Sequence, residues 1–378
     1  MHQNKIMRIG FDAKRAFLNA SGLGNYSRNM ITYLTDQYPG NEYFLFTPRS
    51  SNRFDFASRK QCHTVLPNSF FQKAFPFYWR TYGLNREMQK YELDIYHGLS
   101  NEIPYNISKS SAKSVVTIHD LIFLRFPNLY KRIDRTIYEN KFRHACRNAD
   151  KIIAISEQTK QDIMTFFGTD ESRIAVVYQG CNPIFYQKCE PAEKENIKKK
   201  FNLPDQFILS VGTIEERKNT LQIVKAIHQH HIDIPLVIVG GFTPYVQNIK
   251  AYITKNKMEN QVILLHEVDN RSLPAMYQLC DAFVYPSLFE GFGIPIIEAL
   301  NSGVPVITTT RGCFSEAGGP DSLYVNPENI DELAEAIKSV LTDRDLREKM
   351  VEKSRQYVLN FREERIAADL MKVYKHIL

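Results

Sequence analysis

Short apolar runs rich in β-branched residues alternate with amphipathic stretches along nearly the whole chain of 378 residues. Such alternation is typical of parallel sheets whose strands are joined by crossover helices. Several of the runs, such as LVIVG and FVYP, are continuously apolar, as expected of strands that are covered on both faces. The pattern restarts after a polar stretch with two prolines. We therefore predict an α/β protein built from two doubly wound domains.

The predicted strands form two series. Those of the first half are Ile6–Phe11, Tyr43–Thr47, Thr64–Leu66, Asp94–His97, Ser114–His119, Lys151–Ile155 and Ile174–Tyr178. Those of the second half are Phe207–Gly212, Pro235–Gly240, Val262–His266, Ala282–Tyr285, Val304–Thr308 and Leu323–Val325. Helical periodicity predicts helices over residues 24–37, 129–149, 157–167, 218–230, 245–257, 271–280, 291–301 and 330–342. Two charged helices follow to the end of the chain.

The stretch CEPAEKENIKKKFNLPD is polar and resembles a linker that contains a short charged helix. We expect an N-terminal domain over residues 1–186, this linker over 187–205, a C-terminal domain over 206–358 and a final helix over 359–378. Two such domains that face each other would form a ligand cleft between the carboxyl ends of their strands.

The composition excludes several classes of protein. Hydrophobic residues make up 43% of the chain and charged residues 24%, which is ordinary for a globular protein. No segment approaches the roughly 20 apolar residues that span a bilayer, and MHQNKIMRIGFDAK has no apolar signal core. The six cysteines form no CxxC pair and have no zinc spacing, so we expect them to be reduced. These features predict a cytoplasmic protein.

The charge is uneven. Residues 1–186 hold 25 Lys and Arg against 16 Asp and Glu, whereas residues 187–378 hold 23 against 26. A basic half suits phosphates, an anionic membrane surface or nucleic acid, although it can also serve solubility alone. No nucleic-acid-binding motif is present, so no such partner is expected. The aromatic and basic segment over residues 69–90 would suit a peripheral contact at the inner face of the cell membrane. A core or acceptor-cleft helix is the slightly favoured alternative, because Pro76 and Gly83 interrupt a clean amphipathic helix.

Two segments of the first half carry candidate ligand contacts. SGLGNYSRN follows the first strand, and Gly22 and Gly24 would let its backbone approach an anion or a polar ligand. A plain strand-to-helix turn explains that loop at least as well. His119 and Asp120 directly follow an apolar strand, where α/β sheets bind their ligands. There the imidazole could donate a hydrogen bond to a hydroxyl or accept a proton, unless packing alone satisfies it.

Two further segments lie in the second half. Gly212 and Thr213 end its first strand, and Arg217 and Lys218 follow, as a pair that could hold a diphosphate or simply lie on the surface.

The strongest signal is FEGFGIPIIEAL, residues 289–300. Gly291 and Gly293 free the backbone, Pro295 opens a helix, and Glu290 and Glu298 lie on either side of the helix start. A structural reading explains Gly and Pro there, but not two acids beside so apolar a run.

Together these segments resemble the retaining GT-B glycosyltransferases known as family 4, or group 1. Glu290 and Glu298 match that family's EX7E motif. SVGTIEERKN, HDLIFLRFP and SGLGNYSRN resemble its other segments, and so do KIIAISEQTKQDI and GGPDSLYVNP. CFSEAGGP around Glu316 departs from the family's LPEVAGD-like pattern. The resemblance covers nearly the whole chain. It implies two Rossmann-like domains, the first mainly for an acceptor and the second for a nucleotide-sugar donor, with the last helix crossing back to the first.

The resemblance also implies roles for the matching residues. Arg217 and Lys218 would hold the donor diphosphate, and Glu298 would hold the ribose hydroxyls. Glu290 would contact the hydroxyls of the donor sugar and His119 would lie beside its C6 hydroxyl, so these two are the expected catalytic residues. The other expected contacts, to the donor or in the acceptor and phosphate loop, are Gly212, Thr213, Gly291, Phe292, Gly293, Gly22, Gly24, Asn25 and Asp120.

The expected activity is the retaining transfer of a hexose from a nucleotide sugar to a hydroxyl of a glycan or lipid-linked glycan, in surface polysaccharide biosynthesis. No metal and no cofactor are expected, because two cations and a helix N-terminus can stabilise a leaving diphosphate. GLGNYSRN and HDLIFLRFP resemble mannosyltransferases of the group, which favours GDP-mannose as donor. A UDP-sugar transferase of the same fold and a silent sugar- or nucleotide-binding subunit are the alternatives.

Overall fold

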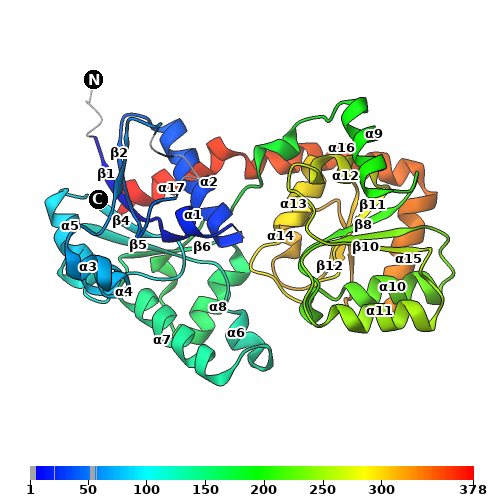
Figure 1. Ribbon diagram of the computed structural model, residues 1–378, viewed down its shortest axis with the longest axis horizontal. Coiled ribbons are helices and arrows are strands. Elements are labelled where there is room, and N and C mark those ends of the chain that lie inside the picture. Colours follow the sequence, from blue (N-terminus) through cyan, green and yellow to red (C-terminus); the bar gives the residue numbers. More distant parts are fainter. Residues whose placement is uncertain (1–5, 21, 52–55, 57) are drawn as a thin grey trace. The chain divides into compact units, whose positions relative to one another are not determined.

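The computed structural model describes residues 6–20, 22–51, 56 and 58–378 (Figure 1). The chain divides into two compact units, each with its own sheet. The first unit comprises Met1–Gln179 together with Arg362–Leu378, and the second comprises Gly180–Phe361.

The first unit contains a seven-stranded parallel sheet, within the residues described, in the order β3-β2-β1-β4-β5-β6-β7. Its strands are β1 (Arg8–Asp12), β2 (Glu42–Phe46), β3 (Cys62–Val65), β4 (Ile95–Gly98), β5 (Lys113–Ile118), β6 (Lys151–Ala154) and β7 (Ile174–Val176). The strand order reverses between β1 and β4. The carboxyl ends of two such strands border the crevice in which open α/β sheets bind ligands.

Helices connect these strands, and the last helix of the chain joins them. The α-helices of the first unit are α1 (Lys14–Leu18), α2 (Gly22–Gln37), α3 (Phe70–Ala74), α4 (Pro76–Tyr78), α5 (Leu84–Lys90), α6 (Ile122–Arg125), α7 (Arg132–Asn148), α8 (Glu157–Phe167) and α17 (Glu363–Ile377). Its other helical turns are η1 (Trp79–Gly83), η2 (Ile107–Lys109), η3 (Pro127–Leu129) and η4 (Glu171–Arg173). Helix α17 packs against α2, and the Tyr374 ring is fully buried.

The second unit contains a six-stranded parallel sheet in the order β10-β9-β8-β11-β12-β13, which reverses between β8 and β11. Its strands are β8 (Ile208–Val211), β9 (Leu236–Val239), β10 (Val262–Leu265), β11 (Ala282–Val284), β12 (Val306–Thr309) and β13 (Leu323–Val325). Its α-helices are α9 (Pro191–Phe201), α10 (Thr220–Gln229), α11 (Val246–Lys255), α12 (Leu273–Leu279), α13 (Ile294–Asn301), α14 (Phe314–Gly318), α15 (Ile330–Thr342) and α16 (Arg344–Tyr357). Its other helical turns are η5 (Pro183–Tyr186), η6 (Glu216–Lys218) and η7 (Val358–Phe361).

The two parallel sheets confirm the predicted α/β class with two Rossmann-like domains. Every predicted strand is present, with its ends displaced by no more than about two residues, because continuous apolar runs are a strong strand signal. Strands covered on both faces require fully buried side chains, and both central strands have them: Ile9 and Phe11 in β1, Ile208 and Leu209 in β8. The short helices α1, α6 and α14 were not predicted, since fewer than two turns leave little periodicity to detect. The helix considered for residues 69–90 is divided into α3, α4, η1 and α5.

The predicted domain boundaries differ from the observed division. The first unit ends at Gln179 rather than at residue 186, and residues 187–205 belong to the second unit instead of linking two domains. Helix α9 packs against α12, and the Cys189 amide donates to Gln278 Oε1 at 3.0 Å. The final segment of the first unit begins at Arg362 rather than at residue 359, because the Phe361 ring packs against Phe292 in the second unit.

All six cysteines are free thiols. None of the helices in the described part of the chain combines the length and the apolar character that crossing a bilayer requires.

Candidate functional site

A largely buried cluster of charges lies where the strand order of the second sheet reverses. Glu290 follows β11, and η6, which follows β8, carries Arg217 and Lys218. Lys218 Nζ lies 2.5 Å from Glu290 Oε1, and Arg217 Nη1 lies 2.8 Å from the same oxygen. The hydroxyls of Ser287 and Tyr285 donate to Glu290 Oε1 at 2.8 and 3.1 Å. The structure thus brings together three residues that the sequence placed in one site.

The protonation state of Glu290 follows from these contacts. Burial alone would raise the pKa of this carboxyl, but Lys218 and Arg217 outweigh burial and lower the pKa to about 2. All of the recorded bonds end on Oε1, and among the described residues none donates to Oε2. Glu290 is therefore a fixed carboxylate with one oxygen available to accept hydrogen bonds from a ligand.

Glu298 is a buried carboxyl of the opposite kind. It lies on α13, and its Oε2 accepts a hydrogen bond of 3.1 Å from the hydroxyl of Tyr277 on α12. Burial raises the pKa of Glu298 to about 7, although the Tyr277 hydrogen bond opposes the shift. No cation partner is recorded for it among the described residues. The two acids of one motif are thus held in different protonation states near neutral pH.

Different local constraints explain why three positions of the second unit are glycine. Gly212 has φ of +152°, and a Cβ built there would lie no nearer than 3.8 Å to any other side chain. Gly293 has φ of +105° and forms the N-cap of α13. The backbones of Gly212 and Thr213 lie so close to Gly240 that any side chain at residue 240 would collide with them. Gly240 is a constraint that sequence reasoning missed.

Gly291 and Phe292 lie between the acids. The Phe292 ring is buried against Phe361, with ring centroids 5.6 Å apart. A ligand could therefore meet the backbone of residue 292 but not its side chain. The Cys313 thiol donates to the carbonyls of Glu290 and Phe292, at 3.3 and 3.0 Å. This thiol fixes the loop that carries Glu290.

The departure from the family pattern around Glu316 also has a local cause. Gly319 has φ of +69°, and a Cβ there would lie 2.6 Å from the Tyr357 ring. The Tyr357 hydroxyl donates to the Glu316 carbonyl at 2.6 Å, and the Tyr324 hydroxyl donates to the Gly319 carbonyl. The loop after α14 is therefore adapted to two tyrosines of this chain.

His119 lies in the first unit, directly after β5, and only 6% of it is exposed. Its Nε2 lies 2.9 Å from the Leu99 carbonyl, which can only accept, so Nε2 carries the proton. Burial lowers the pKa of His119 to about 4, and the ring is neutral near pH 7. The Nδ1 lone pair is then an acceptor. Of the two roles left open by the sequence, the geometry favours accepting a proton or a hydrogen bond over donating one.

A chain of buried hydrogen bonds runs behind His119. The Tyr26 ring contacts His119 edge-on, with centroids 4.5 Å apart, and its hydroxyl lies 3.1 Å from Thr117 Oγ1. Thr117 Oγ1 lies 2.8 Å from His97 Nε2, and His97 Nδ1 lies 2.6 Å from the Tyr374 hydroxyl. Burial lowers the pKa of His97 to about 3. Helix α17 thereby contacts the same neutral network that supports His119.

Three of the remaining predicted residues of the first unit have structural partners: Gly24, Asn25 and Asp120. A Cβ on Gly24 would lie 1.9 Å from the Asn19 carbonyl oxygen, whereas Gly22 has open space around it. Asn25 accepts a hydrogen bond from Arg28, and Asp120 Oδ1 accepts from the Ile122 amide at 3.1 Å. Gly24 therefore meets a packing requirement, which supports the plain-turn reading of that position.

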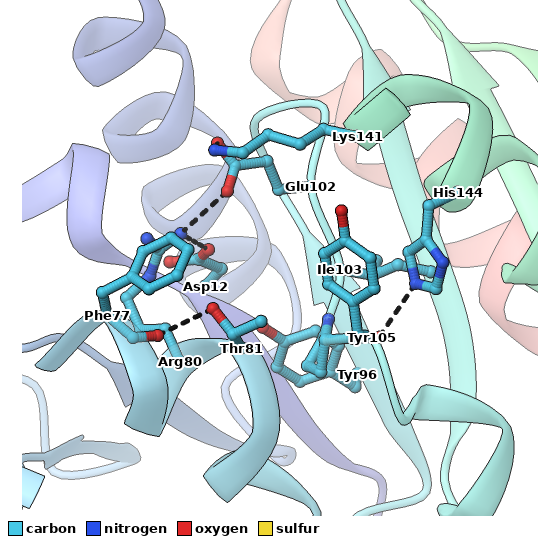
Figure 2. A pocket seen from close by; sticks show the side chains of 11 residues that line it. Asp12, Phe77, Arg80, Thr81, Tyr96, Glu102, Ile103, Tyr105, Lys141 and His144 are labelled. Atoms are coloured by element: carbon cyan, nitrogen blue, oxygen red, sulfur yellow. Dashed lines mark hydrogen bonds and ion pairs between the residues drawn. The ribbon is translucent and has the colours of Figure 1, made fainter. Parts of the chain in front are cut away.

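A pocket of the first unit, which no motif indicated, lies beside the carboxyl ends of β1 and β4 (Figure 2). Arg80 Nη2 lies 2.5 Å from Asp12 Oδ2 and 3.8 Å from Glu102 Oε2, and Lys141 Nζ lies 3.3 Å from Glu102 Oε1. Burial opposes the charge of Arg80, but Asp12 and Glu102 outweigh it and raise the Arg80 pKa. Aromatic rings line the same pocket: Phe77, Tyr96 and Tyr105.

Metal ligands require a cluster of donor side chains. Across residues 6–20, 22–51, 56 and 58–378, no group of three His, Cys, Asp or Glu side chains is arranged to hold a metal ion.

Comparison with known proteins identifies the family. Residues 192–357 match the profile described as glycosyl transferases group 1, and residues 20–184 match that of glycosyltransferase family 4. The O-antigen chain mannosyltransferase B of Escherichia coli is 26% identical over 98% of this chain and 100% of its own length. The O-antigen chain mannosyltransferase RfbU of Salmonella typhimurium is 30% identical over 60% of each chain.

Solved structures share the fold. A glycosyltransferase of Rickettsia africae superimposes with a TM-score of 0.77 over 99% of both chains, at 20% identity. HepE of Anabaena, solved with UDP, has a TM-score of 0.75 over 98% of this chain and 100% of its own, at 15% identity. With a group 1 profile over the second unit, a family 4 profile over the first and the GT-B fold of its neighbours, this chain belongs to the group 1 and family 4 glycosyltransferases, and it resembles the bacterial O-antigen mannosyltransferases.

Proposed function

We propose that the protein is a retaining, metal-independent glycosyltransferase that moves a mannosyl group from GDP-mannose to a hydroxyl of a glycan or lipid-linked glycan during surface polysaccharide synthesis. The observation that carries the proposal is the Arg217–Lys218–Glu290 cluster beside the reversal of the second sheet. No cofactor is part of the proposal, because the nucleotide sugar itself supplies the group that is transferred to the acceptor.

The cluster suits a donor with a diphosphate. Breaking a glycosyl-phosphate bond builds negative charge on the leaving group, and buried cations held in advance stabilise that charge without reorganising. Arg217 supplies planar donors and Lys218 supplies three donors, so each can keep its bond to Glu290 and still meet phosphate oxygens. Glu290 Oε2 would accept from hydroxyls of the sugar, and Glu298 from those of the ribose.

The first unit would supply the acceptor. In a retaining transfer without a protein nucleophile, the acceptor oxygen forms the new bond to the anomeric carbon. Its proton passes to the departing phosphate. His119 Nδ1 would accept a hydrogen bond from a hydroxyl of the donor sugar and so orient it. The pocket of Arg80, Asp12, Glu102 and Lys141 offers donors and acceptors beside aromatic rings, a combination that suits sugar hydroxyls and sugar faces.

The choice of mannose rests on the relatives. Both relatives described above are named O-antigen chain mannosyltransferases, and the match to the first of them extends over its full length. A UDP-sugar donor is the competing possibility, and one experiment separates the two.

The test is thermal stabilisation of the full chain by GDP, UDP, ADP and their sugar conjugates, each with a chelator present. A ligand that binds only the folded state raises Tm with concentration, and no acceptor is needed. We expect a shift with GDP and GDP-mannose. A shift confined to UDP compounds would replace the donor and leave the site intact, whereas no shift at millimolar ligand would remove the donor site.

Turnover then tests the site itself. With the donor that binds, Glu290→Gln should retain nucleotide binding and lose most transfer. The substitution replaces the carboxylate by a neutral amide, which has one oxygen fewer to accept hydrogen bonds from the sugar. Full transfer by this variant would contradict the role of Glu290.

A further inference from the structure

Exposed aromatic rings are concentrated on one region of the first unit. Helices α3 and α4, which Figure 1 labels, are followed by turn η1. The exposed rings of this segment are Phe70, Phe71, Phe75, Phe77, Tyr78 and Tyr82, and the loop after β4 adds Tyr105. We call these seven residues the aromatic face. Phe70 is 90% exposed and Phe77 is 62% exposed, whereas Trp79 in the same segment is fully buried.

Five rings of the aromatic face form one connected series: Phe71, Phe75, Tyr78, Tyr82 and Tyr105. Ring centroids lie 5.6 Å apart between Phe71 and Tyr78, 5.3 Å between Tyr78 and Tyr82, and 6.0 Å between Tyr82 and Tyr105. Tyr105 stacks on His144 of α7 at 4.2 Å. On the same face of α7 as His144 and Lys141, the exposed side chains of Ile133 and Ile137 extend the apolar surface. Figure 2 shows Tyr105 and His144 side by side.

The backbone beneath these rings is well fixed. The side chains and backbones of Ser69 and Gln72 form a capping box on α3, and Trp79 anchors η1 in the core. The Tyr105 amide donates to the Thr81 carbonyl at 2.9 Å, and Asn106 Nδ2 donates to the Tyr82 carbonyl at the same distance. The rings are thus presented on an ordered support, and their exposure is a property of the fold.

Contrast with the second unit makes this exposure informative. Of the large apolar side chains that the structure describes as exposed, only Leu359 belongs to the second unit. Scattered exposed apolar residues need no explanation, but a contiguous patch marks a surface that contacts a partner.

The surrounding charge selects the kind of partner. Residues 66–147 hold 13 Lys and Arg against 7 Asp and Glu, a net charge of +6. Lys73 is exposed on α3 among the phenylalanines, and Lys141 Nζ lies 5.9 Å from the centre of the Phe77 ring. The whole first unit holds 29 Lys and Arg against 19 Asp and Glu, a net charge of +10. Two copies of this unit would repel each other, so a second copy is a poor occupant.

We propose that the aromatic face binds the surface of an anionic lipid bilayer. The phenylalanines would enter the boundary between headgroups and acyl chains, the tyrosines would lie at headgroup level, and the lysines would meet lipid phosphates. This contact is peripheral and needs neither donor nor acceptor, so it stands or falls separately from the proposed reaction.

The test is flotation of the purified full chain with vesicles of phosphatidylcholine alone or of equal parts phosphatidylcholine and phosphatidylglycerol. We expect binding to the anionic vesicles, weakened by salt because exposed charges are screened. The double variant Phe70→Ser, Phe71→Ser should lower the affinity for these vesicles about tenfold or more, because each ring loses its apolar contact. The matched control is Leu359→Ser, which removes an exposed apolar side chain of the second unit and should change nothing.

Three results would overturn the proposal. The first is no binding of the wild-type chain to anionic vesicles, and the second is an equal loss with Leu359→Ser. The third is a wild-type dimer in solution that the double variant abolishes, which would make a second copy the occupant. Because Phe70 and Phe71 are exposed, the double variant should keep its Tm, and an unchanged nucleotide-induced shift would verify that the donor site is intact.

Discussion

The two units share one strand order, apart from the additional strand β7 of the first, and carry different side chains along it. Each has a parallel sheet whose order reverses once, at β1 and β4 in the first unit and at β8 and β11 in the second. The second unit holds a buried, ionised Glu290 with the partly buried Arg217 and Lys218 at that point. Along β4 and β5 the first unit holds two neutral imidazoles, His97 and His119, whose pKa values burial lowers. A shared fold therefore leaves the chemistry to the residues at the strand ends.

The charged side of this comparison should give the largest effect. Lys218→Ala removes a partly buried cation from Glu290 and from the proposed diphosphate site. We expect turnover to fall by about 10²–10³-fold, the loss typical of a preorganised electrostatic contact. Lys255→Ala, which changes an exposed lysine at the end of α11, is the matched control. Steady-state transfer rates measure both, and similar rates in the two variants would contradict the cluster's role.

Gly24 of the first unit and Gly212 of the second allow the stability of the two glycine-containing loops to be compared. Gly24→Ala forces a methyl group against the Asn19 carbonyl, so we expect the free energy of unfolding to drop by about 2–3 kcal/mol. Gly212→Ala meets no close atom and should mainly strain the backbone at φ of +152°, by about 1–2 kcal/mol. Thermal unfolding without ligand compares the two. A larger loss for Gly212 would show that the loop of the first unit is not packed as described.

Deleting a single hydroxyl should disrupt the neutral hydrogen-bond network around His97 in the first unit. Tyr374→Phe deletes the hydroxyl that lies 2.6 Å from His97 Nδ1 and leaves a buried ring nitrogen without its partner. We expect a loss of about 1–2 kcal/mol in stability. Tyr252→Phe is the matched control, because its hydroxyl contacts His228 at 3.2 Å in a half-buried setting, and it should cost less than about 0.5 kcal/mol. Equal losses would mean that burial of the pair does not matter.

The two acids of the second unit give the smallest effect, a pH dependence. The pKa of Glu298 is about 7, so the carboxylate that ribose hydroxyls need is mostly absent at pH 6 and mostly present at pH 8. We expect nucleotide affinity to rise roughly tenfold over that range, and Glu298→Gln to abolish the rise. Titration calorimetry at several pH values measures it. A profile that survives in Glu298→Gln would assign the titration to another group.

The same pKa has a stability consequence of known sign. Since the folded pKa of Glu298 lies above the ordinary value of 4.5, the folded chain binds the proton more tightly, and its stability should fall as pH rises from about 4.5 to 7. Glu290 behaves in the opposite way. Its pKa of about 2 stabilises the fold above pH 4.5, and this stabilisation is lost as pH falls from about 4.5 to 2.

The sequence predicted the sheets well because their strands are buried on both faces and read as continuous apolar runs. The sequence could not predict which aromatic rings of residues 69–90 are buried and which are exposed. Helices α3 and α4, separated by Phe75 alone, are too short to show a helical period, and only the fold determines that Trp79 lies inside and Phe70 outside. The boundary near residue 186 was misplaced because helix α9, a charged helix on the surface of the second unit, has the composition of a linker.

The acids and cations of the second unit were predictable because their motif is unusual for an apolar run. Their supports, Tyr277, Tyr285 and Ser287, were not, since a hydroxyl near a strand end is common and its partner is distant in the chain. Only the position of Tyr285 and Ser287, immediately after β11, could have indicated that they contact the site. The pocket of Arg80 and Glu102 had no signal, because its four charged residues come from four separate segments.

The return of residues 362–378 to the first unit constrains the order of events during translation. Helix α17 buries Ile366, Leu370 and Tyr374 in a unit whose remaining residues were synthesised before the entire second unit. The second unit is continuous in the chain and can fold as soon as it leaves the ribosome, whereas the first must wait with the apolar face of α2 uncovered. Domains commonly fold in the order of their synthesis, but here the domain that starts first is completed last.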